Sequence, residues 1–374
     1  MTARVLYVHH VGELSGAERS LHLLLRHIDR RRVEPLFAGP TRGAFPAALA
    51  ADGVPTLPLD VAPLRRVGGV LSAVATLTRL VREHRVDLLH ANGPQTNVPA
   101  GLAGQLTGRP VIWHARNLLT ADMWDVDRAL APLATRIICN AEAIRRRFAR
   151  SRGWDRSVTI INAVDTREFH PGVARAPFRR ELGVPDAVPL VGIVGRIGLG
   201  KGHEHFVQAA LRLLERGVDA HFVIVGDPLF DADAWRADAL RRAVKDAARE
   251  DRIRFAGYRR DVPAVMRALD VLVLASDAEP CGRVLFEAMA SATAIVATDS
   301  GGTPEIVRHG VEALLVPPRD AGALAEAIAA LAADAGLRAR LGAAGVARVA
   351  ADFTIERYVA ATLAVYDAAL ARRA

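Results

Sequence analysis

The chain has 374 residues, too many for one ordinary hydrophobic core, so two domains are expected. Hydrophobic residues make up 51% and charged residues 24%, which excludes a disordered chain, and the two cysteines, Cys139 and Cys281, are too few for a disulfide scaffold or a zinc site. The net charge of +8 comes from the first half, because residues 1–175 contain 24 arginines and 15 acidic residues, a net charge of +9.

Short apolar runs and amphipathic segments alternate along the first half of the chain. The apolar runs, which predict buried strands, cover residues 5–9, 34–38, 56–59, 87–90, 111–114, 137–140 and 158–161. Segments with helical periodicity cover residues 17–28, 45–51, 70–84, 96–106 and the strongly basic stretch 142–150. This alternation predicts a mostly parallel sheet with right-handed crossover connections.

The second half repeats this organisation after a segment that lacks periodicity. Residues 162–177 have the composition of a linker, so we expect a boundary at 170–178 and domains at 1–172 and 173–374. Strands are predicted at residues 190–194, 221–225, 253–255, 271–275, 294–298 and 314–316. Helices are predicted at residues 204–216, 234–249, from 283 onward, 321–332, 335–349 and 355–371. The fold class is therefore α/β, with two Rossmann-like, doubly wound domains.

A glycine-rich loop opens the second half, between a predicted strand and a predicted helix. Its sequence is Gly195-Arg196-Ile197-Gly198-Leu199-Gly200-Lys201-Gly202. Glycines let a phosphate approach the backbone, and the start of the next helix favours negative charge. Arg196 and Lys201 add two cations, which fit a departing diphosphate. Because Gly202 follows Lys201 where a P-loop needs Ser or Thr, the loop is not a P-loop; an ordinary glycine turn is the alternative.

Two carboxylates mark the strand–loop–helix–strand unit of residues 275–306. Glu279 lies in the loop, and Glu287 lies one turn into the helix that begins near Arg283. The first N–H groups of a helix have no acceptor within it and favour an anion. Two acids that can hold hydroxyl groups around an anion site suit a nucleotide sugar, whereas an ordinary surface role is the alternative for Glu287.

These stretches resemble the retaining GT-B glycosyltransferases of family GT4. In the second half the resemblance is carried by residues 195–202, by the Glu279–Glu287 pair and by residues 288–290 and 297–306. In the first half it is carried by residues 15–19, by His114 at a strand end and by the junction at residues 162–171. The resemblance covers essentially the whole chain. It implies two domains that face each other across a cleft, with the last helix, 355–371, crossing back to the first domain.

The resemblance also implies roles for individual residues. Arg196 and Lys201 would bind the diphosphate of the donor, and Glu287 would accept hydrogen bonds from its ribose hydroxyls. Glu279 would contact the transferred sugar and, with His114 near the sugar or acceptor, is expected to be catalytic. Backbone N–H groups would hold the sugar and distal phosphate around Cys281, Gly282, Arg283 and Val284, and Gly16 would lie against the diphosphate. Residues that could touch the acceptor are Ser15, Asn92, Arg116 and Asn117.

The predicted function is retaining transfer of a hexose-type sugar from a nucleoside-diphosphate sugar to a hydroxyl group. The acceptor would be a cell-envelope glycan, a lipid-linked saccharide or a related small molecule. The resemblance implies no cofactor and no metal, and a UDP- or GDP-sugar as donor, with UDP slightly favoured. The alternatives are a nucleotide-sugar epimerase or a phosphorylase on the same fold, or an inactive sensor of nucleotide sugars. Cys281 departs from the family, which commonly has an aromatic residue there, and this bears on donor choice.

The basic first half favours an anionic partner, with a solvated arginine-rich face as the alternative. Residues 145–154 mix Arg with Phe and Trp, which suits peripheral contact with an anionic membrane. No nucleic-acid partner is expected, because the sequence shows no aromatic platform or known module. The N-terminal run predicts a strand rather than a signal peptide, and no stretch of about 18 apolar residues is present. We therefore expect a cytoplasmic protein that is peripheral at the inner face of the cell membrane.

Overall fold

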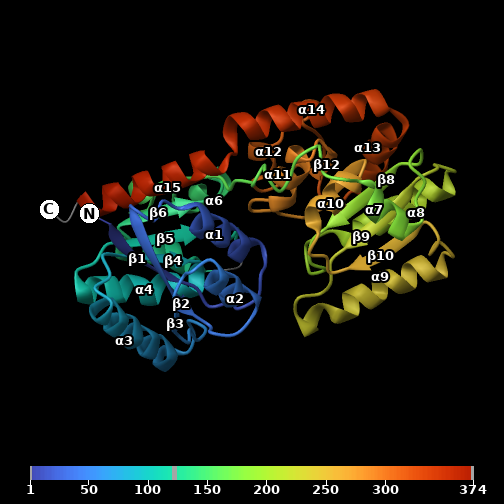
Figure 1. Cartoon of the computed structure of the whole chain (residues 1–374). Helices are drawn as coiled ribbons and strands as arrows, with labels where there is room; N and C mark the ends of the chain where they lie inside the picture. The colour runs from blue at the N-terminus through green and yellow to red at the C-terminus, as the bar shows by residue number, and fades with distance from the viewer. Residues whose placement is uncertain (1, 120–123, 372–374) are drawn as a thin grey trace. The chain divides into compact units, whose positions relative to one another are not determined.

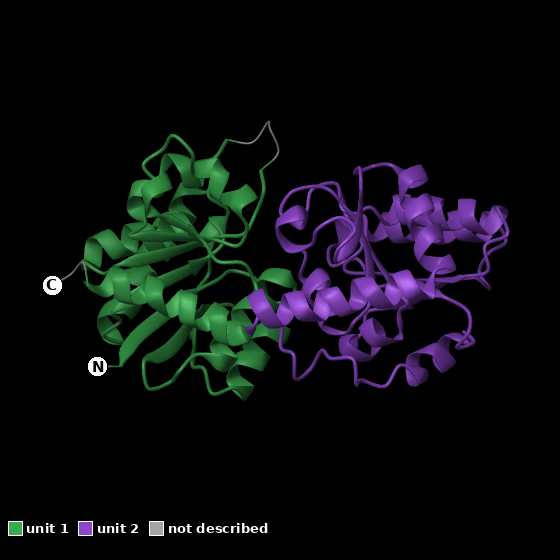
Figure 2. Cartoon of the chain, turned by 90° about the horizontal axis from the view of Figure 1, so that it is seen from above, with its two compact units in different colours: residues 1–163, 355–374 green, residues 164–354 purple. Residues whose placement is uncertain are grey.

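The computed structural model describes residues 2–119 and 124–371 of the chain. The chain divides into two compact units, residues 1–163 with 355–374 and residues 164–354 (Figure 2). The described part of each unit holds one parallel β-sheet with helices on its faces, so the predicted α/β class with two Rossmann-like domains is confirmed. No helix within the described ranges has both the length and the apolar character needed to cross a membrane.

The sequence predicted a domain boundary after residue 172, whereas the second unit begins at Val164. Val164 belongs to the second unit because its N–H donates to the Phe353 carbonyl at 3.3 Å and it forms a bridge with Thr354. The predicted linker also contains the start of a helix, α7 (Ala176–Leu182). Pro177 begins this helix rather than preventing it, since proline is tolerated in the first helical turn, where an N–H has no partner.

The first unit is built on a seven-stranded parallel sheet in the order β3-β2-β1-β4-β5-β6-β7 (Figure 1). The strands are β1 (Ala3–Val8), β2 (Val33–Gly39), β3 (Thr56–Pro58), β4 (Leu88–Asn92), β5 (Val111–Ala115), β6 (Arg136–Cys139) and β7 (Ser157–Thr159). The helices are α1 (Gly16–His27), α2 (Ala44–Ala51), α3 (Val67–Glu83), α4 (Pro94–Thr107), α5 (Val126–Ala129), α6 (Glu142–Arg145) and α15 (Ile355–Leu370), with 3-10 turns η1 (Ala131–Leu133), η2 (Arg146–Phe148) and η3 (Trp154–Arg156).

Alternate residues of β1 enter two different cores. Leu6 and Val8 pack on the side that includes residues of α3 and α4. Val5 and Tyr7 pack on the opposite side, with residues of α1 and of α15. Figure 1 shows α15 lying along the strands of this unit although it is last in the chain. The apolar face of α15, which includes Tyr366, is therefore part of the first core.

The second unit is built on a six-stranded parallel sheet in the order β10-β9-β8-β11-β12-β13. The strands are β8 (Leu190–Val194), β9 (His221–Val225), β10 (Ile253–Gly257), β11 (Val271–Leu274), β12 (Ala294–Thr298) and β13 (Ala313–Val316). Besides α7, the helices are α8 (His203–Glu215), α9 (Ala234–Asp246), α10 (Val262–Ala268), α11 (Arg283–Ala290), α12 (Thr303–Ile306), α13 (Ala321–Ala333) and α14 (Ala335–Asp352), with the 3-10 turn η4 (Asp231–Asp233).

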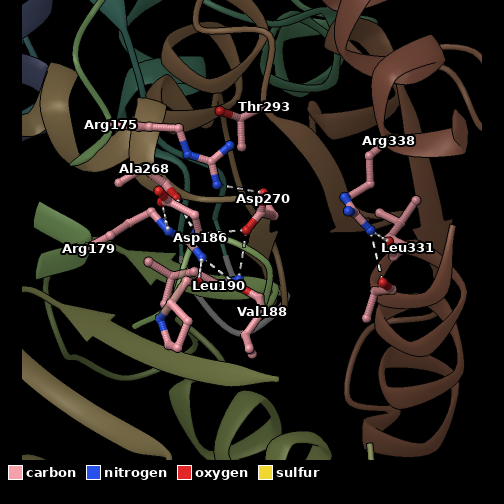
Figure 3. Close-up of polar contacts among 12 residues, drawn as sticks. Arg175, Arg179, Asp186, Val188, Leu190, Ala268, Asp270, Thr293, Leu331 and Arg338 are labelled. Carbon is pink, nitrogen blue, oxygen red and sulfur yellow. Dashed lines mark hydrogen bonds and ion pairs between the residues drawn. The ribbon is translucent and has the colours of Figure 1, made fainter. Parts of the chain in front are cut away.

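A buried arginine fixes α7 to the sheet of the second unit (Figure 3). The Arg179 side chain is 1% exposed and forms an ion pair with Asp270 at 2.8 Å. Its guanidinium also donates to three backbone carbonyls, those of Pro185, Val188 and Ala268. The same Asp270 carboxylate accepts the N–H of Leu190, the first residue of β8. A longer contact, 3.4 Å, joins Arg179 to the exposed Asp186, but the short contacts of this buried guanidinium are all to Asp270 and backbone carbonyls, so the cluster is a structural anchor.

The composition of residues 142–150 predicted one basic helix, and this prediction is wrong. The stretch forms the short α6 followed by η2, and Arg150 takes a left-handed conformation with φ of 57°, which ends the helical run. Phe148 is fully buried, and the Arg145 guanidinium stacks over the Trp154 ring at 4.0 Å. This segment therefore does not offer a free aromatic face to a membrane.

Candidate functional site

The glycine-rich loop connects β8 to α8 and packs against the end of β11. Gly202 has φ of 72°, and a Cβ atom there would lie 1.9 Å from the Ala275 carbonyl oxygen. Only glycine fits such a position, because a side chain would meet rigid backbone. This close approach brings Lys201, which precedes Gly202, beside the loop that follows β11.

Lys201 and Glu279 are in direct contact although 78 residues separate them in the sequence. Lys201 Nζ donates to Glu279 Oε2 at 2.8 Å, and Ser276 Oγ donates to the same oxygen at 3.1 Å. The backbone carbonyl of Glu279 accepts the N–H of Gly302 at 2.8 Å. The lysine side chain keeps 31% exposure and the glutamate 11%, so both can be reached by a ligand.

Arg196 lies on the same loop but is directed elsewhere. Its Nη1 is 3.6 Å from Asp233 of η4, and its guanidinium carbon is 5.4 Å from the centre of the Phe230 ring. The side chain is 37% exposed. Because this contact is long and the arginine side chain is partly exposed, the ion pair contributes little free energy, and Arg196 can exchange Asp233 for a stronger anion.

Helix α11 begins in the loop that carries Glu279. Gly282 is its N-cap residue, and Arg283 and Val284 are its first two positions, whose N–H groups have no acceptor within a helix. Arg283 Nη2 donates to Glu287 Oε1 at 3.1 Å, which ties the buried Glu287 side chain, one turn further along, to the start of the helix. Cys281 is 7% exposed and is not part of a disulfide. The residues predicted to grip a sugar nucleotide within this unit thus lie on two adjacent loops and one helix start.

In the first unit, α1 begins with a capping box at Ser15. The Ser15 N–H donates to Glu18 Oε2 at 2.9 Å, and the Ser15 hydroxyl donates to the same oxygen. Glu18 Oε1 lies 2.5 Å from Nε2 of His9, the residue after β1. Burial alone would raise the pKa of Glu18, but the hydrogen bonds with His9 and Ser15 lower it to about 2. Ser15 is therefore committed to the helix start, and Gly16 follows it as the first helical residue.

A second polar cluster lies at the carboxyl ends of β4 and β5, entirely inside the first unit. Arg116 is 5% exposed and donates through Nε to Asn92 Oδ1 at 2.6 Å. Its Nη2 lies 3.2 Å from Nδ1 of the fully buried His114, and that Nδ1 also lies 3.2 Å from His90 Nε2. Burial, the positive charge of Arg116 and the neighbouring His90 hold the pKa of His114 well below its usual value, so this imidazole is neutral.

Three of the four residues predicted to touch an acceptor are thus engaged internally. Asn92 and Arg116 bond to each other, and Ser15 bonds to Glu18. Asn117 is the exception, because its side chain is exposed while its carbonyl oxygen accepts from Arg147 at 2.7 Å. The structure therefore places Arg116 and Asn92 as supports of His114, and leaves Asn117 open to solvent.

Sequence reasoning missed several residues of these clusters. Ser276 could have been found, since it is a polar residue directly after a buried strand and three residues from Glu279. His90 also ends an apolar run, as His114 does. Tyr366 had no usable signal, because it lies 276 residues from the histidine that its hydroxyl contacts. Among the residues described, no group of three or more His, Cys, Asp and Glu side chains is arranged to hold a metal ion.

Two family models match the chain, one in each half. Residues 14–168 match the model described as Glycosyltransferase Family 4, and residues 188–334 match Glycosyl transferases group 1. The lipopolysaccharide core biosynthesis mannosyltransferase LpcC of Rhizobium leguminosarum bv. viciae is 32% identical over 279 residues, which cover 69% of this chain and 78% of LpcC.

Similar relatives extend over more of the chain. The alpha-maltose-1-phosphate synthase of Mycobacterium tuberculosis (strain ATCC 25618 / H37Rv) is 31% identical over 340 residues, covering 81% of this chain and 86% of the synthase. The crystal structure of Anabaena Alr3699/HepE in complex with UDP-glucose superposes with a TM-score of 0.85 and 26% identity, covering 96% of this chain and 99% of that one. Both halves of the chain thus match known proteins, in sequence and in fold.

Proposed function

The chain belongs to glycosyltransferase family 4 and is a glycosyltransferase with the GT-B fold, and from this membership we propose its substrates and its chemistry. It transfers a hexose-type sugar from a UDP-sugar to a hydroxyl group of a cell-envelope glycan, a lipid-linked saccharide or a related small molecule, with retention and without a metal. The complex of HepE with UDP-glucose supports the donor, and the role of LpcC in lipopolysaccharide core biosynthesis supports the acceptor class. None of the relatives described above is named an epimerase or a phosphorylase.

One observation carries the proposal: the contact between Lys201 and Glu279 beside the first turn of α11. The lysine and the glutamate neutralise each other in the free protein. A bound diphosphate would compete for Lys201 with two negative charges, and Glu279 would then be free to accept hydrogen bonds from sugar hydroxyls. Since Lys201 and Arg196 lie on one loop, two cations are available to stabilise the charge of the leaving diphosphate.

The remaining residues of the site each bind a different part of the nucleotide sugar. Glu287, held by Arg283, accepts hydrogen bonds from the ribose hydroxyls. The N–H groups at the start of α11, around Cys281, Gly282 and Val284, hold the distal phosphate and the sugar. In the first unit we assign Gly16 to the diphosphate and His114 to a hydroxyl of the bound saccharide. The phosphate that leaves can take the acceptor proton, so no separate base is needed.

The basic character of the first unit supports one further partner. We propose that exposed arginines hold the enzyme at the inner, anionic face of the cell membrane. Exposed arginines outside residues 145–148 include Arg30, Arg31, Arg32, Arg65 and Arg66. Co-sedimentation with vesicles containing phosphatidylglycerol should therefore exceed that with neutral vesicles and should fall as salt is raised.

The direct test is a transfer assay with a panel of UDP- and GDP-sugars and envelope saccharide acceptors, run in the presence of EDTA. We expect turnover with a UDP-sugar, no loss of rate in EDTA, and a product whose anomeric configuration by NMR matches that of the donor. Hydrolysis or isomerisation of the donor with no acceptor product would contradict the proposal.

A further inference from the structure

A chain of hydrogen-bonding groups runs from the last helix to His114 inside the first unit. The Tyr366 hydroxyl of α15 lies 3.1 Å from the Tyr7 hydroxyl of β1 and 2.6 Å from Nδ1 of His90 in β4. His90 Nε2 lies 3.2 Å from Nδ1 of His114 in β5. His114 Nε2, at the end of this chain, is buried without a partner among the residues described.

Arg116 decides which way the protons in this chain point. A guanidinium can only donate, so its contact with His114 Nδ1 at 3.2 Å requires a lone pair on that nitrogen. A neutral His114 must then carry its proton on Nε2. His90 must then also donate to Nδ1, through Nε2–H, and it shares the single lone pair of that nitrogen with Arg116 in a three-centre hydrogen bond.

The remaining hydrogen bonds, from Tyr366 to His90, can run in the same direction, toward His114. With its proton on Nε2, a neutral His90 offers a lone pair at Nδ1, which the Tyr366 hydroxyl fills by donating at 2.6 Å. Either phenol can donate across the 3.1 Å contact between Tyr366 and Tyr7, and because Tyr366 has only one proton, which goes to His90, the Tyr7 hydroxyl is the donor. Both histidines are held neutral: burial, with the charge of Arg116, lowers the pKa of His90 to about 3 and lowers that of His114 as well. Each described donor and acceptor from Tyr366 to His114 Nδ1 is thereby paired.

We propose that Tyr366, His90 and Arg116 are positioning residues that hold His114 as the Nε2–H tautomer, with that N–H offered to a hydroxyl oxygen of the bound saccharide. A buried N–H without an acceptor is costly unless a ligand supplies one. This role rests on the proposed function, because that function assigns His114 to the saccharide. It makes α15 a part of the active machinery as well as of the first core.

The tautomer can be measured without any substrate. In the full chain with ¹⁵N-labelled histidine, long-range ¹H–¹⁵N spectra distinguish a protonated Nε2 from a protonated Nδ1, and the spectrum of His114→Gln assigns the His114 signals. We expect His114 and His90 both to carry their proton on Nε2. Protonation of His114 at Nδ1 would overturn the proposal, whatever the enzyme turns out to transfer.

The kinetic test compares two tyrosines of the same helix. Tyr366→Phe removes the hydroxyl that fixes His90, whereas Tyr358→Phe removes a buried hydroxyl that has no partner among the described residues. We expect Tyr366→Phe to lower kcat about tenfold, the rate equivalent of about one hydrogen bond, with little change in the KM for the donor. Tyr358→Phe should retain the wild-type rate and the wild-type histidine spectrum.

A second pair of variants tests the nitrogen that acts. The amide nitrogen of a glutamine reaches the place of Nε2, while that of an asparagine reaches only the place of Nδ1, so His114→Gln should be faster than His114→Asn. Equal rates for this pair, or equal rates for Tyr366→Phe and Tyr358→Phe in an enzyme that transfers sugar, would overturn the positioning role. Failure of the wild type to transfer sugar from a nucleotide donor would instead contradict the proposed function, and the tautomer measurement would still stand.

Discussion

The two units hold their charged and polar site residues in different ways. In the second unit Lys201 pairs with Glu279 while 31% of the lysine side chain stays exposed, and Arg196 rests against Asp233 at 3.6 Å. In the first unit His90, His114 and Asn92 are fully buried and bonded to one another or to Arg116. An ion pair whose cation is partly exposed exchanges its partner more readily than a fully buried network, which keeps one geometry. The second unit is thus suited to grip and release a charged ligand, and the first to present a fixed hydrogen-bond donor.

The largest expected effect comes from removing the exchangeable cation. Lys201→Ala should lower kcat/KM for the nucleotide sugar by about 10²- to 10³-fold, because the charge of the leaving diphosphate loses its nearest lysine. Lys245, the other lysine of the chain, is exposed on α9, so Lys245→Ala is the matched control and should be fully active. Steady-state rates and thermal unfolding of both variants check this, and an unchanged rate for Lys201→Ala would remove the diphosphate assignment.

The buried ion pair between Arg179 and Asp270 lies in the second unit but, like the buried network of the first unit, should be costly to break. Arg179→Ala leaves the largely buried Asp270 with the more exposed Arg175 as its remaining ion-pair partner among the described residues. It also frees three backbone carbonyls, so we expect a loss of about 3–5 kcal/mol in the free energy of unfolding. Arg180→Ala changes the exposed neighbour on α7 and should be within about 0.5 kcal/mol of wild type. Urea unfolding measures the stability of both variants. Similar midpoints would show that the buried arginine contributes no more to stability than the exposed one, which would contradict the prediction.

The buried histidines should make the protein sensitive to mild acid. Their pKa values in the folded chain lie below that of an unfolded histidine, about 6.5, so the unfolded state binds more protons and stability falls as the pH drops below about 6.5. Between pH 7 and pH 5 each of His90 and His114 should cost about 2 kcal/mol. Burial also lowers the pKa values of His10 and His203 to about 4, and these add to the slope.

His114→Gln isolates one term of this pH dependence. The glutamine does not titrate, so the melting temperature of the variant should decrease less between pH 7 and pH 5 than that of the wild type. Parallel melting curves for the two proteins across that range would mean that His114 can be protonated in the folded state.

The smallest expected effect concerns a single hydrogen bond at the exchangeable pair. Ser276→Ala removes the hydroxyl that donates to Glu279 at 3.1 Å and should lower kcat/KM about fivefold, equivalent to about 1 kcal/mol. Ser291, another fully buried serine, has no partner for its hydroxyl among the described residues, so Ser291→Ala should leave the rate unchanged. A rate for Ser276→Ala equal to that of the Ser291→Ala control would show that Glu279 needs no such support.

Much of the fold could be predicted from the sequence, because each strand is a short apolar run between amphipathic helices. The predicted ranges 190–194, 221–225 and 294–298 coincide with β8, β9 and β12. The errors came where local pattern and tertiary position disagree. Composition extended the basic helix to residue 150, whereas the fold needs a turn there, and Pro177 read as linker although it opens α7.

The site could be predicted only as far as its chemistry is local. Parallel-sheet topology brings loops after neighbouring strands together, so the proximity of Lys201 and Glu279 follows from β8 and β11 being adjacent. The inward direction of Arg116 could not be foreseen, since a strand end exposes or buries a side chain according to what packs beside it. The contact of Tyr366 with His90 depends on where α15 docks, which no local pattern records.

Titration calorimetry with UDP in the presence of EDTA tests the central claim, that the second unit grips a uridine diphosphate through an exchangeable lysine without a metal. The wild type and Lys245→Ala should bind UDP equally, and Lys201→Ala should bind it at least about tenfold more weakly, since each tenfold change corresponds to about 1.4 kcal/mol. No heat of binding for UDP with the wild type, or the same Kd for Lys201→Ala, would contradict it.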